Sequence, residues 1–298
     1  MQITIGSTPY HFVKYRLGVD GVDKIMEMVG EKIIKLADSK DAKLDSTPLE
    51  ASRYDQHSDF NPHYGCKMDK AHITMIGTYP VFMTYTNGLA GDSISLTSHI
   101  AAFLRMKADI DEYRLDGSYD SFLNHADIWY KLKAEPLISL PVDAVINKEG
   151  ELGRINHWMN RLWKLGGSKC MKIGEKLKFL YENGRQEQVG RYLRNQNLED
   201  KTFPDLCKLR SECERIHWHI KKLHTSCTEI IYQISVAIER GTFILSRTLK
   251  NTVKFDVRRV RNESRELYSK INLVIYQLLL LTNLQNHIKP ANSFENYI

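Results

Sequence analysis

The chain has 298 residues, of which 42% are hydrophobic and 26% are charged, a composition typical of globular proteins that excludes disordered and fibrous classes. The longest apolar run, around Leu278 to Leu281, is far shorter than the roughly 20 residues that a membrane span needs. The start MQITIGSTPY lacks the pattern of a secretory signal and the five cysteines are scattered, so we expect a cytoplasmic protein without a membrane partner.

The net charge of +6 is distributed unevenly along the chain. Residues 151–222 carry 16 Lys+Arg against 9 Asp+Glu, so this stretch holds the positive excess. A basic half suits a phosphate-binding surface. Solvated helix faces with more Lys than Glu would have the same composition, and this alternative stays open.

The first half of the chain changes from a helical pattern to strand patterns. Apolar residues at three- and four-residue spacings predict a helix over residues 10–37. AKLDSTP (42–48) predicts a short strand that ends in a turn. KAHITMIGTYPVFMTYTNG (70–88) predicts two strands, HITMI and VFMTYT, around a Gly77-Thr78 turn. SISLTSHIAAFLRMKA (93–108) returns to a helical pattern.

The pattern then alternates before it becomes wholly helical. EYRLDGSYDSF predicts a short strand ending at Asp116, a turn, and a helix that starts near Tyr119. EPLISLP (135–141) predicts another strand, and residues 142–205 read as helices separated by glycines. Alternating strands and helices predict an α/β protein with a mixed sheet covered by helices.

Two aspartates lie where predicted strands give way to turns. Asp45 and Asp116 would lie side by side at one edge of the sheet if their strands are parallel neighbours. Each aspartate could instead form a turn or cap a helix, since aspartate favours such positions.

A third acid lies on a strongly basic helix. In LRSECERIHWHIKK (209–222), Arg210, Glu214 and Lys221 are four and seven residues apart and share one helical face. An ordinary ion pair between Arg210 and Glu214 explains the first spacing equally well. Three converging carboxylates would repel one another unless they bound cations, and oxygen-only clusters suit Mg²⁺ or Mn²⁺.

These residues resemble the DDE transposases of insertion sequences. The resemblance rests on LDSTPLEASRYDQHSDFNPHYGCKMDKAHITM from position 44, NGLAGDS (87–93), LDGSYDSF (115–122) and the spacing R-x₃-E-x₆-K at Arg210, Glu214 and Lys221. It covers about residues 40–285. The family's fuller motif has a tyrosine three residues before the arginine, where this chain has Cys207.

The resemblance implies a ribonuclease-H-like fold with a five-stranded mixed sheet. It implies an N-terminal helical segment over 1–38, a shortened DNA-binding region, followed by a catalytic domain over 39–285. A helical insert over about 142–205 precedes the third acid, and a tail covers 286–298.

The resemblance also implies an activity, a cofactor and partners. Asp45, Asp116 and Glu214 would be the catalytic acids and the ligands of two Mg²⁺ or Mn²⁺ ions, and Arg210, Lys221 and Tyr119 would contact DNA. The implied function is metal-dependent cleavage at insertion-sequence ends and strand transfer into double-stranded target DNA. A homodimer on DNA, associated with the nucleoid, is expected. An inactive or domesticated DNA-binding protein, or a nuclease without strand transfer, remains an alternative.

Overall fold

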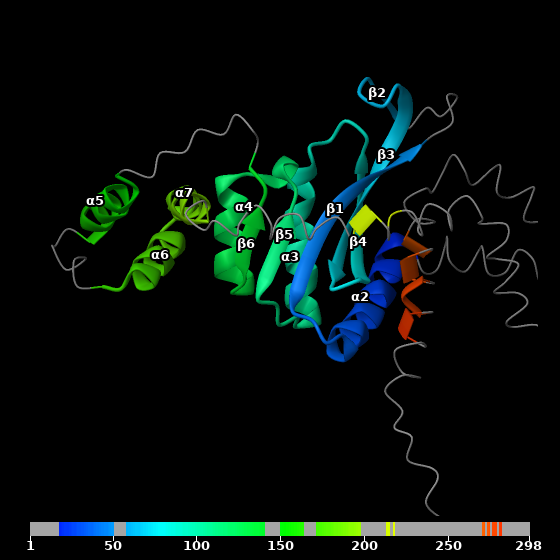
Figure 1. Cartoon of the computed structure of the whole chain (residues 1–298), viewed down its shortest axis with the longest axis horizontal. Helices are drawn as coiled ribbons and strands as arrows, with labels where there is room; N and C mark the ends of the chain where they lie inside the picture. The colour runs from blue at the N-terminus through cyan, green and yellow to red at the C-terminus, as the bar shows by residue number, and fades with distance from the viewer. Residues whose placement is uncertain are drawn as a thin grey trace, which may run out of the picture.

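The computed structural model describes residues 18–50, 58–140, 150–163 and 171–197, together with individual helical positions at 213, 214, 217 and between 270 and 281. Over these residues the protein is an α/β structure with an open, mixed, six-stranded sheet flanked by helices (Figure 1). No helix among the described residues combines the length and apolar character needed to cross a bilayer.

The sheet contains an antiparallel half and a parallel half. β1 lies in the middle, antiparallel to β3 on one side and parallel to β5 on the other. β4 and the short β2 both pair with β3, and β6 is parallel to β5. The strands are β1 (Asp41–Glu50), β2 (Asp59–Asn61), β3 (Cys66–Ile76), β4 (Tyr79–Asn87), β5 (Glu112–Leu115) and β6 (Glu135–Ile138).

The predicted hairpin and the two later strands are confirmed. β3 and β4 meet around Gly77, whose positive φ of 55° suits the left-handed turn conformation that glycine adopts easily. The last six residues of β3 are all buried because this strand is covered on both faces.

Two expectations about the sheet are wrong. The first strand is not short: β1 continues through Pro48 to Glu50, because β3 supplies hydrogen-bonding partners along its whole length. The sheet also has six strands rather than five, because β2 adds to β3 beyond the point where β4 ends.

The helices before the insert follow the apolar periodicity of the sequence. α2 (Gly18–Leu36) buries Val22, Met26, Val29 and Ile33 at helical spacings and packs against β4 and α3. The later elements are the 3₁₀ turn η2 (Asp92–Ser95), α3 (Leu96–Met106), the 3₁₀ turn η3 (Gly117–Tyr119), α4 (Phe122–Asp127) and the π-helical turn η4 (Ile128–Leu132).

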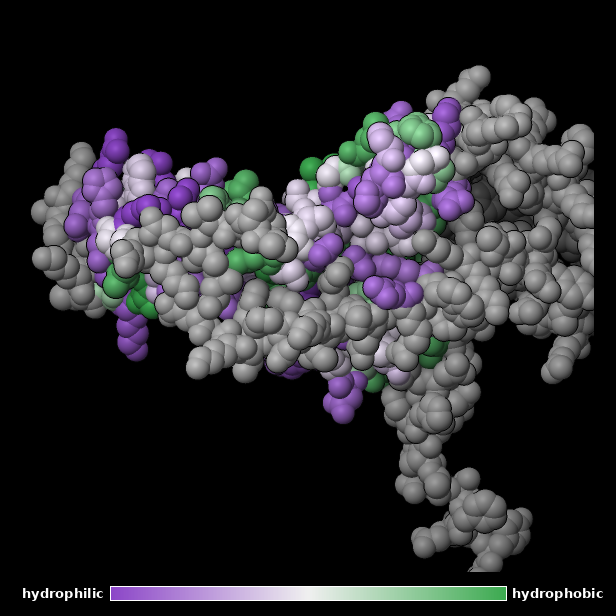
Figure 2. All heavy atoms as spheres, turned by 45° about the horizontal axis from the view of Figure 1, so that its top comes forward, coloured by the Kyte–Doolittle hydropathy of each residue, from purple (hydrophilic) through white to green (hydrophobic). Residues whose placement is uncertain are grey.

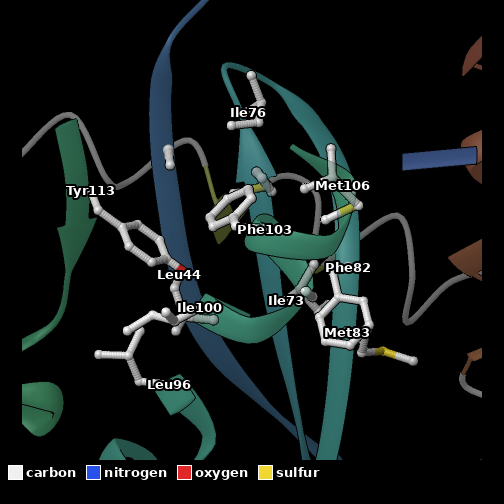
Figure 3. Close-up of a cluster of buried hydrophobic side chains, with 14 of the residues drawn as sticks. Leu44, Ile73, Ile76, Phe82, Met83, Leu96, Ile100, Phe103, Met106 and Tyr113 are labelled. Atoms are coloured by element: carbon white, nitrogen blue, oxygen red, sulfur yellow. The ribbon is translucent and has the colours of Figure 1, made fainter. Parts of the chain in front are cut away.

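The main core lies between the sheet and these helices. Figure 3 shows Phe103 of α3 beside Tyr113 of β5, and their ring centroids are 5.4 Å apart in an edge-to-face arrangement. α2 approaches closely because Gly30 has no side chain: a Cβ there would lie 2.5 Å from the carbonyl oxygen of Val81.

A second, smaller core belongs to the segment after β6. Three helices, α5 (Glu151–Trp163), α6 (Ile173–Glu182) and α7 (Gln186–Gln196), bury Ile155, Met159, Leu177, Leu180 and Val189 together with Ala126 of α4. They lie at the β6 end of the molecule, and α7 packs on α4 (Figure 1). The described residues of the expected insert are therefore helical, with a core of their own.

Candidate functional site

Two acidic residues follow the last paired position of β1 and β5. β1 and β5 are parallel and pair in register at Leu44 and Leu115, so the residues that follow, Asp45 and Asp116, are neighbours across the sheet. Parallel strands lie about 4.8 Å apart and side chains alternate between the faces, so both carboxylates extend to the same face. The parallel pairing that the sequence hypothesis required is therefore present.

The two strands carry the same charge pattern below this acidic pair. DAKLD (41–45) and EYRLD (112–116) each read acid, base, acid at alternate positions, and in register these form three rungs on one sheet face. The middle rung is buried, with Lys43 3% and Arg114 5% exposed. Its ion pairs join Lys43 to Asp41 at 3.2 Å, and Arg114 to Asp41 and to Glu112. The two lower rungs hold equal numbers of acids and bases, and the ladder ends in the pair of like charges at Asp45 and Asp116.

The segment of the third acid comes close to Asp45. His217 Nδ1 lies 3.9 Å from Asp45 Oδ2, and Cys213, one helical turn earlier, is buried in the main core. Glu214 is helical and exposed. The segment that carries Glu214 therefore packs beside the first aspartate.

The described arrangement does not assemble a three-acid metal site. Over the residues that the structure describes, which include Asp45, Asp116 and Glu214, no group of three or more His, Cys, Asp or Glu side chains is placed to hold a metal ion. The aspartate pair alone suits a hard cation, because Mg²⁺ is often held by one or two carboxylates with water and substrate phosphates completing its shell. The donor chemistry of Asp45 and Asp116 is of this kind, whereas among the described residues Glu214 does not form a metal-holding group with them.

Asp116 also begins a tight turn. Its Oδ1 accepts a hydrogen bond of 2.7 Å from the backbone of Gly117, so the carboxylate caps η3 as the turn-forming alternative expected. This cap fixes the orientation of the Asp116 carboxylate at the end of β5.

Tyr119 does not face solvent, in contrast to the expectation of a DNA contact. Its side chain has no exposed surface, and its hydroxyl lies 2.9 Å from His72 Nδ1 of β3. A buried hydroxyl is not available to a DNA phosphate. Tyr119 instead anchors the turn after Asp116 to the sheet.

The network around Tyr119 is uncharged. Burial lowers the pKa of His72 to about 4, with Asp92 acting in the opposite direction, and the second ring nitrogen lies 2.8 Å from Thr86 Oγ1. Burial is also the main reason that the pKa of Tyr119 is raised well above its usual range. A neutral histidine and a neutral phenol therefore fix the turn near pH 7.

A salt bridge beside Asp45, between Lys70 and Asp92, was not predicted from the sequence. Lys70 Nζ lies 2.9 Å from Asp92 Oδ1, and Ser46 Oγ donates to Asp92 Oδ2 at 2.8 Å. Burial acts to raise the pKa of Asp92, but hydrogen bonds from Lys70 and Ser46 outweigh it and hold the pKa below its usual value. The NGLAGDS stretch contains Asp92, yet only the tertiary contacts show that it links β1, β3 and η2.

Two of the predicted DNA contacts, Arg210 and Lys221, lie outside the described residues. The visible surface of the insert is mostly hydrophilic in Figure 2, at the end of the molecule where α5–α7 lie. Comparisons with protein-family models, with curated proteins and with solved structures found no match to this chain.

Proposed function

We propose that the protein is a DNA transposase that cleaves phosphodiester bonds at the ends of a mobile element and transfers the freed strand into double-stranded DNA. The observation that carries this proposal is the parallel pairing of β1 with β5, because Asp45 and Asp116 each directly follow its last paired position, Leu44 with Leu115. Without the short β2, the strand order β4-β3-β1-β5-β6 has the directions of a ribonuclease-H-like sheet. That order supports the finer fold assignment, and the described α5–α7 fit the helical insert expected before the third acid.

In this proposal the chain positions groups rather than reacting covalently. Asp45 and Asp116 would hold a divalent cation, and Glu214 would supply the third carboxylate ligand. Two divalent ions would activate the attacking oxygen and stabilise the leaving oxygen. Arg210 and Lys221 bind the phosphates of the element's ends, which a homodimer brings together.

Asp116→Asn is the first test of this function. The probe is labelled duplex DNA taken from both flanks of the chain's own reading frame, incubated with Mg²⁺ or Mn²⁺ and analysed for nicks and joined products. Wild type should nick the duplex. The nicking rate of the variant should fall by more than about 100-fold, because loss of a direct metal ligand should cost more than the roughly 10- to 100-fold typical of residues that only support the ligands. The variant should still bind DNA.

Asp109→Asn is the matched control, because Asp109 lies just before β5, is 81% exposed and pairs with Lys40. It should nick at the wild-type rate. Equal rates for Asp116→Asn and Asp109→Asn would remove Asp116 from the site. Nicked products without joined products would indicate a nuclease that lacks strand transfer.

One observation favours a second candidate, a transposase-derived protein that binds DNA without cutting it. The three acids do not form a metal-holding group in the described conformation. Retention of the flanking DNA with no nicking in either cation would support this candidate over the enzyme. Nicking that Glu214→Gln abolishes would exclude it.

A further inference from the structure

A buried ion pair joins the insert to the turn that follows Asp116. Arg194 of α7 donates to both carboxylate oxygens of Asp120, with Nε 2.9 Å from Oδ1 and Nη2 2.7 Å from Oδ2. The side chains are 11% and 7% exposed. His125 Nε2 lies 3.0 Å from the same Asp120 Oδ1. The Asp120 carboxylate, only four residues after Asp116, is thus hydrogen-bonded by two side chains, Arg194 and His125.

In the cluster of Asp120, Arg194 and His125, the first two side chains are charged and the histidine is neutral at pH 7. Burial acts to raise the pKa of Asp120, but hydrogen bonds from His125 and Arg194 outweigh it and the pKa lies below its usual value. Burial lowers the pKa of His125, so its ring is neutral at pH 7 and donates Nε2–H to the carboxylate. The pair is therefore a charged, bidentate contact in a largely dry environment, the geometry that fixes orientation most strongly.

The backbones of the two elements are also in direct contact. Gly190 of α7 lies so close to Phe122 that a Cβ there would overlap the carbonyl oxygen of Phe122. The guanidinium groups of Arg191 and Arg194 lie 4.7 Å and 5.8 Å from the centre of the Phe122 ring. α7 is therefore held against the start of α4 at a fixed distance.

The same turn is anchored from its other side by Tyr119. Its hydroxyl contacts His72 of β3, and Asn124 Nδ2 donates to its carbonyl oxygen at 2.7 Å. Adjacent residues thus tie the turn to two different elements, Tyr119 to β3 of the sheet and Asp120 to α7 of the insert.

We propose that Arg194 is a positioning residue and that the helical insert, through the Arg194–Asp120 latch, holds the Asp116 carboxylate in its working orientation. This inference rests on the proposed function only for its catalytic consequence. A stabilising role alone explains the pair poorly, since the insert already has its own core and well-packed apolar residues in place of a buried ion pair are often equally stable. Bidentate pairs do supply geometric specificity.

Hydrogen exchange of the full-length protein tests the latch without any cleavage. Arg194→Met should speed amide exchange across residues 116–121 by at least about 10-fold. These amides include that of Gly117, which donates a hydrogen bond to Asp116. Leu180→Ala is the control: Leu180 is fully buried in the insert core and the side-chain hydrogen bonds to Asp120 come from Arg194 and His125, so this change lowers stability while leaving the latch intact. Unchanged exchange in Arg194→Met, or equal acceleration in both variants, overturns the latch.

Cleavage kinetics then test the catalytic consequence. Arg194→Met should lower the single-turnover nicking rate by about 10- to 100-fold while the Kd for DNA changes by less than about twofold, because Arg194 is nearly buried. Arg194→Lys keeps the positive charge but cannot make the bidentate hydrogen bonds of the guanidinium, and it should recover part of the nicking rate. A proportional loss of DNA affinity, or no loss of rate, overturns the positioning role.

The two experiments fail separately. A wild-type protein that nicks no DNA refutes the proposed function, whereas the exchange rates at 116–121 still decide whether the latch holds the turn. Faster amide exchange in Arg194→Met without a fall in the nicking rate would show that cleavage does not require an ordered turn. That outcome also overturns the positioning role.

Discussion

Two fully buried histidines lie between the sheet and η2–α3, each in a chain of neutral hydroxyl groups. His72 lies between Tyr119 and Thr86, and His99 of α3 lies 2.7 Å from Thr74 Oγ1 and 2.8 Å from Thr84 Oγ1. Burial lowers the pKa of both rings because the charged form would lose its hydration. The neutral imidazole is therefore part of the folded state.

The pH dependence of stability should reflect His72. Its folded pKa of about 4 lies below the ordinary 6.5, so the unfolded chain binds the proton more tightly. The free energy of unfolding should fall as pH decreases from about 6.5 to about 4, by up to about 3 kcal/mol from this residue, with His99 adding in the same direction. Urea unfolding at pH 7, 5.5 and 4.5 measures the change.

His72→Gln removes the titration and should flatten part of this slope. The control His63→Gln changes an exposed histidine and should leave the slope as in wild type. Identical slopes for His72→Gln and wild type would show that the ring is accessible to protons in the folded protein.

At the scale of elements, helix glycines differ in what surrounds them. Gly190 of α7 is in backbone contact with Phe122, and Gly30 of α2 approaches Val81, whereas Gly153 of α5 has no atom within 4 Å of a built Cβ. The helical sequence alone does not distinguish these positions. Their different surroundings are set by which helix packs against which neighbour.

Gly190→Ala and Gly153→Ala should therefore change stability in opposite directions. The first should destabilise by about 3 kcal/mol or more, because the methyl group overlaps a backbone carbonyl. The second should stabilise by about 0.5–1 kcal/mol, since alanine favours the helix. Thermal or urea unfolding measures both, and a stabilising Gly190→Ala would contradict the described packing of α7 on α4.

Strand lengths show where element prediction succeeds and fails. The β3–β4 hairpin was predictable because its apolar residues and the Gly77-Thr78 turn are adjacent in the chain. The full length of β1 was not, because Pro48 and the polar residues near it form a strand only when β3 supplies a partner. β2 was missed for the same reason, since its three residues have almost no pattern of their own.

At the scale of the whole molecule, positive charge concentrates in the later part of the chain. The basic stretch 151–222 includes the described insert helices. DNA affinity that depends on phosphate contacts decreases as the salt concentration rises, because the release of counterions from DNA on binding becomes less favourable. If the insert contacts DNA, its exposed lysines should contribute to this salt dependence, and exposed lysines far from it should not.

Lys178→Glu and Lys35→Glu form a matched pair for this test. The two lysines are 62% and 65% exposed, and each faces a glutamate one helical turn away. Lys178→Glu should weaken binding to any duplex and lower the slope of log K against log salt by about 1, whereas Lys35→Glu on α2 should change neither much. Fluorescence anisotropy at several salt concentrations measures the slopes, and equal effects would show only a dependence on net charge.

The sequence by itself determined the α/β class, the hairpin, the helices in the described part of the insert, and two aspartates at or just after predicted strands. These features follow from short-range periodicity and turn chemistry, which act between residues a few positions apart. Only the tertiary structure decided that Asp45 and Asp116 are neighbours, that Tyr119 is buried, and that Arg194 reaches Asp120 across 74 residues of chain. Such contacts depend on how strands pair and helices pack after the intervening loops close, and no local pattern encodes them.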